Sequence, residues 1–173
     1  MAARQLADVT FPDAIIAALR RHGVSPDLLI IEITESALIL DPDRANQVLE
    51  RLREHGVDIS IDDFGTGYSS IAHLRAMPPD ELKIDRSFVM RMCHDPRDET
   101  IVRALVGLAK NLNVRVVAEG VEDADAYAAL SVLGCDEAQG YHISRPMPPE
   151  QFFAWLRQQE GGAVGRQPEV MIS

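Results

Sequence analysis

Residues 57–70 read VDISIDDFGTGYSS: an apolar segment, Val57–Ile61, runs directly into the pair Asp62-Asp63 and then into a loop rich in glycine and serine. The apolar segment is predicted to be a buried β-strand. Two adjacent carboxylates at the end of a buried strand are costly to desolvate unless a cation compensates them. The loop that follows is predicted to bend closely around a ligand. The pattern therefore predicts a divalent metal site at the end of this strand.

Short apolar runs alternate with amphipathic helices on both sides of this stretch. Buried strands are predicted at Leu28–Thr34, Glu81–Asp85, Val114–Ala118 and Cys135–Tyr141. Helices are predicted over residues 11–22 with Thr10 as the cap, from Asp41-Pro42 to Gly56, through Ile71 and Leu74, from Asp95-Pro96 through Leu112, from Asp123 to Leu133, and from Pro148. Repeated strand–helix units with near-continuous apolar strands predict a parallel sheet covered by helices.

A doubly wound sheet and a (β/α)₈ barrel both fit this α/β pattern. A polar residue stands at or near the carboxyl end of every predicted strand, which is typical of a barrel with its chemistry on one face. These residues are Glu32, Asp62, Asp63, Lys83, Asp85, Glu119 and Gln139. A complete barrel takes about 250 residues and eight strands. The chain has 173 residues and five predicted strands, so the barrel is predicted to be incomplete.

The acidic pair on its own could be a solvated turn or a helix cap, because polar clusters are common in turns. Glu32 lies inside a predicted buried strand and Glu119 ends another, and buried carboxylates are rarely left unpaired. Four carboxylates meeting on one face would repel one another without cations. Oxygen ligands favour Mg²⁺ or Mn²⁺, and no pair of histidines or cysteines with metal-binding spacing competes for a softer metal.

Other candidate residues have a functional and a structural interpretation. Lys83 could be an ordinary exposed strand lysine, or it could neutralise a phosphate or orient a metal-bound water. Gln139 could be a turn residue, or it could donate a hydrogen bond to a ligand from the last strand. The aromatic residues Phe152, Phe153 and Trp155 follow helical spacing, and they are predicted to belong to the hydrophobic core.

Composition narrows the class of protein. The chain carries 27 acidic and 17 basic side chains, a formal charge of −10, which argues against a nucleic-acid polymer or an anionic membrane surface as partner. Cys93 and Cys135 form no disulfide framework, and a cytoplasmic protein is predicted. No apolar run approaches the roughly 20 residues that span a bilayer. The tail from residue 159 to 173 lacks periodicity and is predicted to be disordered.

The candidate residues occur in five motifs that resemble, in order and spacing, those of the EAL-domain family of bacterial cyclic di-GMP phosphodiesterases. The resemblance covers about residues 3–156. The matching motifs are Glu32–Ser36 (EITES), Asp62–Ser70 (DDFGTGYSS), Leu82–Asp85 (LKID), Ala118–Glu122 (AEGVE) and Gln139–Tyr141 (QGY). The resemblance implies a modified (β/α)₈ TIM barrel, of which about five of eight strands are present here.

The resemblance also implies the chemistry. Active members of the family linearise cyclic di-GMP with two Mg²⁺ or Mn²⁺ ions. By motif, the metal ligands are implied to be Glu32, Asp62, Asp63 and Glu119, with Asp62 bridging the two ions. Two-metal hydrolysis lowers the pKa of a water and clamps the phosphodiester for in-line attack.

The remaining motif residues take implied roles as well. Glu119 resembles the residue that handles the proton of the attacking water, and Lys83 the one that orients this water. Gln139 and Asp85 resemble substrate-binding residues. Glu35 resembles the glutamate that anchors the Asp62–Ser70 loop, through which metal binding and dimerisation are coupled in the family.

The family's name motif, Glu-Ala-Leu, has no counterpart in this sequence. Its glutamate is a metal ligand, and a further ligand, the asparagine of an Asn-x-Ser segment, is expected immediately before Met1. The first ion would keep only Glu32 and Asp62, whereas the set for the second ion is complete. Residues 1–158 are therefore expected to be the C-terminal portion of an EAL domain, with negligible hydrolysis of cyclic di-GMP by this chain alone.

Three explanations of this shortened pattern remain open. The favoured one is a fragment of a longer active enzyme. The chain could instead be a catalytically dead module that binds cyclic di-GMP or another protein, or its missing strands could come from a second chain. The corresponding partners are a homodimer, the missing N-terminal part, or a sensor or cyclase domain. Outside the family, the layout of acids and lysine would also permit a metal-dependent barrel lyase or aldolase acting on small anions.

Overall fold

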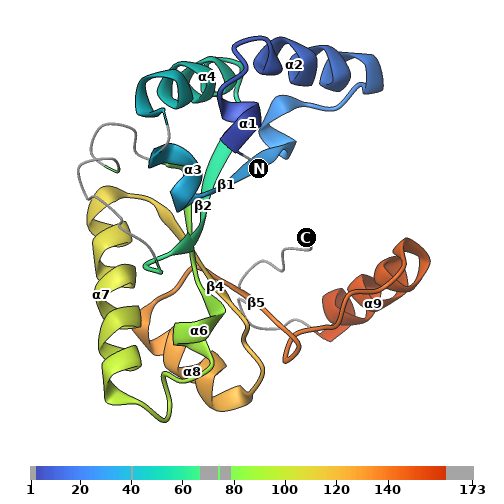
Figure 1. The fold of residues 1–173 in the computed structure, drawn as a ribbon. Coiled ribbons are helices and arrows are strands. Elements are labelled where there is room, and N and C mark those ends of the chain that lie inside the picture. Colours follow the sequence, from blue (N-terminus) through green and yellow to red (C-terminus); the bar gives the residue numbers. More distant parts are fainter. Residues whose placement is uncertain (1–2, 40, 67–73, 75–78, 163–173) are drawn as a thin grey trace.

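A five-stranded parallel sheet organises the computed structural model, which describes residues 3–39, 41–66, 74 and 79–162 (Figure 1). The strands lie in chain order, and each one pairs in parallel with the next. They are β1 (Ile30–Thr34), β2 (Asp58–Phe64), β3 (Glu81–Ile84), β4 (Arg115–Glu119) and β5 (Glu137–Gln139). Because all five run the same way, their carboxyl ends meet at one edge of the sheet. The predicted α/β class and parallel sheet are confirmed.

Helices connect the strands and cover the sheet. The helices of the described residues are α1 (Ala3–Leu6), α2 (Phe11–His22), η1 (Pro26–Leu28), α3 (Glu35–Ile39), α4 (Pro42–Glu54), α6 (Arg86–Val89), α7 (Pro96–Leu112), α8 (Ala124–Leu133) and α9 (Pro149–Gly162). In Figure 1, α2 and α4 lie beside the β1–β2 half, α7 and α8 lie along the other half, and α9 stands apart from the sheet. The predicted helix through Ile71 falls mostly outside the described residues.

The helix starts follow from aspartates that cap them. Asp41, Asp95 and Asp123 each accept a hydrogen bond from a backbone N–H of the first turn, at 3.2, 2.9 and 2.8 Å. The predicted Thr10 cap is wrong. Thr10 has helical dihedral angles and caps nothing; instead its backbone N–H and its hydroxyl donate to Asp8, at 2.9 and 2.7 Å. A residue already in the helical conformation cannot fold its hydroxyl onto the N–H groups that follow it.

Three strands differ from prediction by two residues or more at one end or both, and β3 and β4 differ by one residue. β1 begins at Ile30, because Pro26–Leu28 forms a 3₁₀ turn. β5 is confined to Glu137–Gln139. β2 continues through the acidic pair to Phe64, with an irregular register after Ile61 and with Asp63 in the left-handed region, at a φ of 55°. Strand irregularities and left-handed non-glycine residues cluster next to functional sites.

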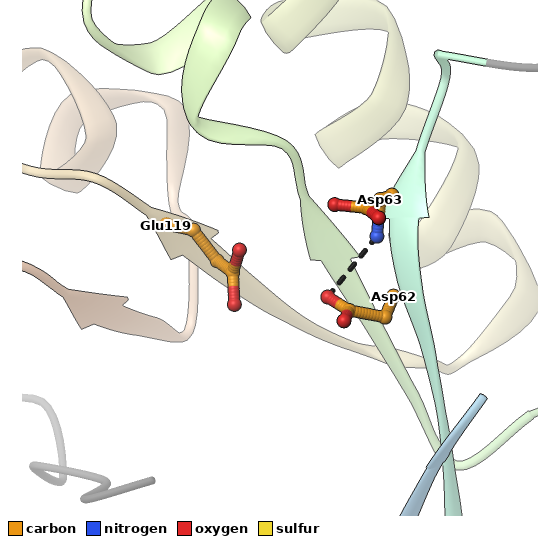
Figure 2. Close-up of side chains that lie close together, drawn as sticks. All are labelled: Asp62, Asp63 and Glu119. Atoms are coloured by element: carbon orange, nitrogen blue, oxygen red, sulfur yellow. Dashed lines mark hydrogen bonds between the residues drawn. The ribbon is translucent and has the colours of Figure 1, made fainter. Parts of the chain in front are cut away.

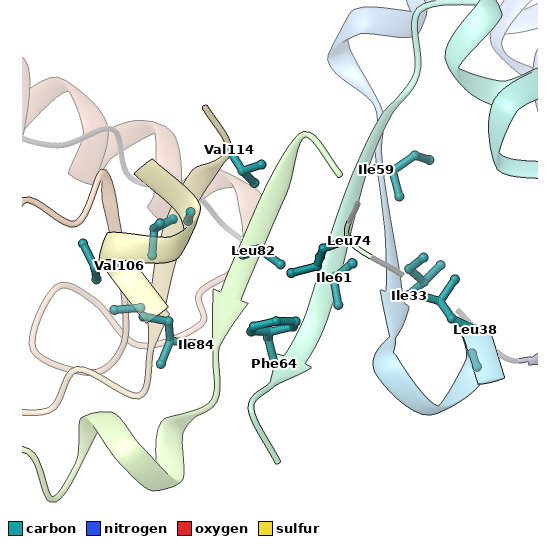
Figure 3. Packing of buried hydrophobic residues seen from close by; sticks show 14 of the residues in the cluster. Ile33, Leu38, Ile59, Ile61, Phe64, Leu74, Leu82, Ile84, Val106 and Val114 are labelled. Carbon is teal, nitrogen blue, oxygen red and sulfur yellow. The ribbon is translucent and has the colours of Figure 1, made fainter. Parts of the chain in front are cut away.

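The hydrophobic core lies between the sheet and the helices that cover it. Figure 3 shows Ile59 and Ile61 of β2 and Leu82 and Ile84 of β3 in this core, with Val106 of α7 nearby. On β3 the alternate residues, Glu81 and Lys83, point to the opposite face of the sheet, and both are buried. The sheet therefore has one apolar face against helices and one polar face that carries charged groups.

The aromatic cluster of α9 is not part of this core, contrary to the prediction. Phe152 contacts Phe153 and Trp155, with ring centroids 5.7 and 6.1 Å apart. The Phe153 side chain is 59% exposed, and none of the three belongs to the buried cluster. Helical spacing correctly predicts that these residues lie on a helix, but it does not say whether another element covers their side chains. Among the described residues, no helix is long and apolar enough to cross a membrane.

Candidate functional site

The ends of the central strands bring the predicted acidic residues together. Asp62 on β2 is level with Thr34 on β1, and Glu119 on β4 is level with Gln139 on β5. Between them, β3 contributes Lys83, which is level with Val117. Residues that are far apart in the sequence thus share one edge of the sheet because the register of a parallel sheet aligns its carboxyl ends.

Three carboxylates form a cluster at this edge. Asp62, Asp63 and Glu119 each offer an oxygen, and these oxygens lie within 4.8 Å of one another. Figure 2 shows Glu119 on β4 turned toward the two aspartates of β2. The backbone N–H of Asp63 donates to Asp62 Oδ1 at 3.1 Å, which fixes the direction of the Asp62 side chain. The left-handed backbone at Asp63 makes it possible for two consecutive strand residues to serve one site, since consecutive side chains otherwise point to opposite faces.

Lys83 lies at the centre of the acidic residues. Its Nζ is 2.6 Å from Glu119 Oε1, 2.7 Å from Glu32 Oε1 and 3.8 Å from Asp62 Oδ1. Its side chain is only 3% exposed. Burial lowers the pKa of this ammonium, but hydrogen bonds to Glu119 and Glu32 and the negative charge of both outweigh burial and raise the pKa. Lys83 is therefore a charged group at every physiological pH.

Burial and neighbouring negative charge raise the pKa of two carboxylates of the site, Glu119 and Asp63. Burial and the negative charges of Asp62 and Glu32 raise the pKa of Glu119, although Lys83 opposes this change. The pKa of Asp63 is raised by burial, by the charges of Asp62 and Asp85, and by a hydrogen bond to Asp85. Four carboxylates around one ammonium leave the site negatively charged. An all-oxygen donor set with excess negative charge fits a hard divalent cation such as Mg²⁺ or Mn²⁺.

Glu32 contacts Lys83 rather than joining the three-carboxylate cluster. Asp85 caps α6: it accepts from the Ser87 backbone N–H at 3.0 Å and from the Ser87 hydroxyl. Gln139 ends β5, and the residue after it, Gly140, packs so closely on Val121 that a β-carbon there would lie 2.2 Å from the Val121 carbonyl oxygen. This contact leaves the end of β5 little freedom relative to the end of β4.

Glu35 is not a member of the three-carboxylate cluster; it is the first residue of α3. The residue is 8% exposed, and within the described part of the chain neither of its carboxylate oxygens has a hydrogen-bond partner. The segment it is predicted to anchor, residues 67–70, falls outside the described residues. A buried carboxylate at this place is costly unless another group contacts it, so Glu35 remains a candidate anchor.

Sequence reasoning missed the contribution of α6. This four-residue helix touches the loops that leave both β2 and β4, through Gly65 and Gly120. A glycine follows both Asp63 and Glu119 within two residues, and these glycines are the signal that could have indicated a close backbone approach.

Comparison with known proteins identifies the family of this chain. The EAL domain model matches residues 1–146. The chain is 47% identical over 154 residues to MucR, a bifunctional diguanylate cyclase/cyclic di-GMP phosphodiesterase of Pseudomonas aeruginosa, covering 89% of this chain and 22% of MucR. It spans 20 to 27% of the first three curated relatives that it matches.

Solved structures share the fold of this chain. The MucR phosphodiesterase in complex with c-di-GMP superposes with a TM-score of 0.83 at 47% identity, over 88% of this chain and 62% of that one. The manganese/cy-diGMP complex of BlrP1 from Klebsiella pneumoniae gives a TM-score of 0.73 at 35% identity, over 78% of this chain and 34% of that one. These neighbours contain EAL domains, which have a TIM-barrel-like fold, so the predicted barrel class is confirmed. With its parallel sheet, its acidic edge and its match to the family model, the chain belongs to the EAL domain family.

Proposed function

We propose that this chain carries the second-ion half of a cyclic di-GMP phosphodiesterase site. The observation that carries the proposal is the cluster of Asp62, Asp63 and Glu119, with Lys83 Nζ 2.6 Å from Glu119. The relatives support the choice of substrate, because MucR and two others carry the name of a cyclic di-GMP phosphodiesterase. The BlrP1 structure is a manganese complex, which supports a divalent ion as the cofactor.

Each residue of the site has its own proposed role. Asp62, Asp63 and Glu119 would hold the divalent ion, Mg²⁺ or Mn²⁺, with Asp62 at the boundary to a second ion. The bound ions would supply an acidified water and neutralise charge on the phosphodiester. Glu119 can accept a proton from that water, since its carboxylate is held at the site 2.6 Å from the Lys83 ammonium. Lys83 holds the Glu119 carboxylate in place and presents positive charge toward the phosphate.

Glu32 and Lys83 define the side of the site for the first ion. Glu32 is 2.7 Å from Lys83 Nζ, so an ion between Glu32 and Asp62 would have to share these carboxylates with the ammonium. The glutamate of Glu-Ala-Leu and the asparagine of Asn-x-Ser, the family's other ligands for this ion, have no counterpart in this sequence. We therefore expect this chain alone to bind one divalent ion and to hydrolyse cyclic di-GMP negligibly.

Residues outside the acidic cluster have proposed roles in substrate binding and in anchoring a loop. Gln139 and Asp85, at the carboxyl ends of β5 and β3, are the candidate substrate-binding groups. Glu35 is the candidate anchor of the loop after Asp63, through which a homodimer or another domain could influence the site. The intracellular nature of a cyclic dinucleotide signal favours a cytoplasmic location.

A binding or regulatory module is the second candidate, and it is favoured by Glu32, which is engaged by Lys83 Nζ at 2.7 Å on the side of the first ion. Both candidates predict that cyclic di-GMP and Mn²⁺ bind to this chain. They differ when the missing residues are supplied: an enzyme part should gain activity, whereas a dead module should bind without turnover.

The test measures hydrolysis with and without the complementary segment. The purified chain is incubated with cyclic di-GMP and Mn²⁺, and the linear dinucleotide is quantified by chromatography. The incubation is repeated with the N-terminal part of the MucR phosphodiesterase domain that this chain does not cover. We expect no product from the chain alone and product when the two are combined. The Glu119→Gln variant should abolish that product, and Asp58→Asn, at the other end of β2, should not.

Three results would contradict the proposal in different ways. Linear product from the chain alone would refute the expected inactivity. Binding of cyclic di-GMP without product from the combined segments would favour the regulatory module. Absence of both binding and product would refute the phosphodiesterase assignment.

A further inference from the structure

Helix α6 lies against the loops that leave two of the strands of the acidic site. It begins at Arg86, three residues after Lys83, and Asp85 caps it. On one side it meets Gly65, two residues after Asp63: a β-carbon on Gly65 would lie 3.3 Å from Phe88 Cε2 and 3.3 Å from Leu105 Cδ1 of α7. On the other side it meets Gly120, the residue after Glu119. The helix thus contacts the exits of β2 and β4, while β3 leads directly into it.

The contact at Gly120 is the tighter one. A β-carbon on Gly120 would lie 2.4 Å from Arg86 Cβ and 3.2 Å from Arg86 Cα. The φ of Gly120 is 71°, in the region that favours glycine. Arg86 Cα belongs to the backbone of α6, so rotation of the Arg86 side chain cannot make room. A larger residue at position 120 would have to move either the end of β4 or the helix itself.

Movement at this contact would reach the acidic cluster directly. Glu119 is bonded to Gly120, and its carboxylate is 2.6 Å from the ammonium of Lys83. Asp62 and Asp63 stand on β2, whose exit loop rests on the other side of the same helix. The oxygens of the cluster lie within 4.8 Å of one another, so a displacement of a fraction of that distance changes whether one cation can contact all three.

We propose that α6 is a spacer that sets the separation of Glu119 from Asp62 and Asp63, with Gly120 as the positioning residue through which it acts. The proposal rests on the divalent binding proposed above for these carboxylates. It adds that the geometry of the cluster is determined by a helix that contributes no metal ligand. If α6 served stability alone, a substitution at Gly120 would lower the folded fraction without changing the cation affinity of the folded protein.

The test compares Mn²⁺ affinity by titration calorimetry in four proteins. They are the wild type, Gly120→Ala, Gly23→Ala, and the double variant Gly120→Ala with Arg86→Gly. Gly23 is the matched control: its φ is 66°, and a β-carbon there meets nothing within 4 Å, so the substitution brings backbone strain without the contact. The double variant removes Arg86 Cβ and relieves the closest contact.

We expect Gly120→Ala to weaken Mn²⁺ binding by about tenfold or more, the range seen when groups that orient metal ligands are lost. Gly23→Ala should bind as the wild type does, and the double variant should regain most of the affinity. Wild-type affinity in folded Gly120→Ala would overturn the proposal. If Gly120→Ala does not fold, Gly65→Ala takes its place, because its added carbon meets only side-chain atoms, and wild-type affinity there would likewise overturn it.

A second measurement separates failure of this proposal from failure of metal binding. Amide ¹H–¹⁵N shifts are recorded without metal, and the signals of Asp62 and Asp63 should move in Gly120→Ala and return in the double variant. If the wild type binds no Mn²⁺, the proposed ion site is refuted, and these shifts alone decide the role of α6. If the Asp62 and Asp63 signals do not move in Gly120→Ala, the proposed role of α6 as a spacer is overturned, whether or not the wild type binds Mn²⁺.

Discussion

At the scale of a single residue, Lys83 supplies the positive charge that compensates the carboxylates of the site. Its ammonium is the common partner of Glu32 and Glu119 and lies 3.8 Å from Asp62. The sequence placed Lys83 among the acidic residues but left open whether it was an exposed strand lysine. Its burial and its partners depend on the register between β3 and its neighbours, and a single sequence does not contain that register.

We predict that Lys83→Met destabilises the protein by about 1–3 kcal/mol at pH 7, because it leaves part-buried carboxylates without their cation. The pKa of Lys83 is raised above its usual 10.5, so its stabilisation is complete below that pH and is lost as the pH rises through the folded-state pKa. Urea unfolding should therefore show a constant difference from pH 7 to 10 that shrinks above it. Lys110→Met, at an exposed site, is the control, and an equal loss there would contradict this role.

At the scale of elements, the sequence predicts the starts of the helices more accurately than the ends of the strands. Asp123 precedes α8 and caps it as predicted, because a short acidic side chain next to an apolar period is a local signal. The end of β2 was missed: the irregular register and the left-handed Asp63 arise from its pairing with β3 and from the loop after it. The contact of α6 with Gly120 was missed for the same reason, since it joins segments more than 30 residues apart.

The helix caps provide a test at this scale. Asp123→Ala should lower the free energy of unfolding by about 1 kcal/mol, because the Ala126 N–H loses its acceptor. Thr10→Ala should change it by less than about 0.5 kcal/mol, as for other exposed positions, since Thr10 caps no helix. Chemical denaturation of both variants measures the two values. A larger loss of unfolding free energy in Thr10→Ala than in Asp123→Ala would contradict the finding that the Thr10 side chain caps no helix.

At the scale of the whole molecule, the alternation of apolar runs with amphipathic helices sufficed to predict a parallel α/β fold, and the polar residues at the strand ends sufficed to predict one polar edge. Aromatic spacing did not suffice for α9, whose aromatic residues lie outside the core, because a helical pattern does not show which element packs against the helix. The chain corresponds to 62% of the solved MucR phosphodiesterase chain, and within the described residues β1 and β5 stand at the two ends of the sheet. The acidic cluster nevertheless lies on the inner strands β2 and β4, so it forms without any further strand.

The central claim is that Asp62, Asp63 and Glu119 bind a divalent cation in this chain. Titration calorimetry with Mn²⁺ tests it most directly, on the wild type, on Asp63→Asn and on Asp58→Asn, a matched substitution on the same strand where the carboxylate pairs with Arg115 at 3.0 Å. We predict one bound Mn²⁺ per wild-type chain, a loss of affinity of about tenfold or more in Asp63→Asn, and unchanged affinity in Asp58→Asn. Absence of Mn²⁺ binding, or equal losses in the two variants, would contradict the claim.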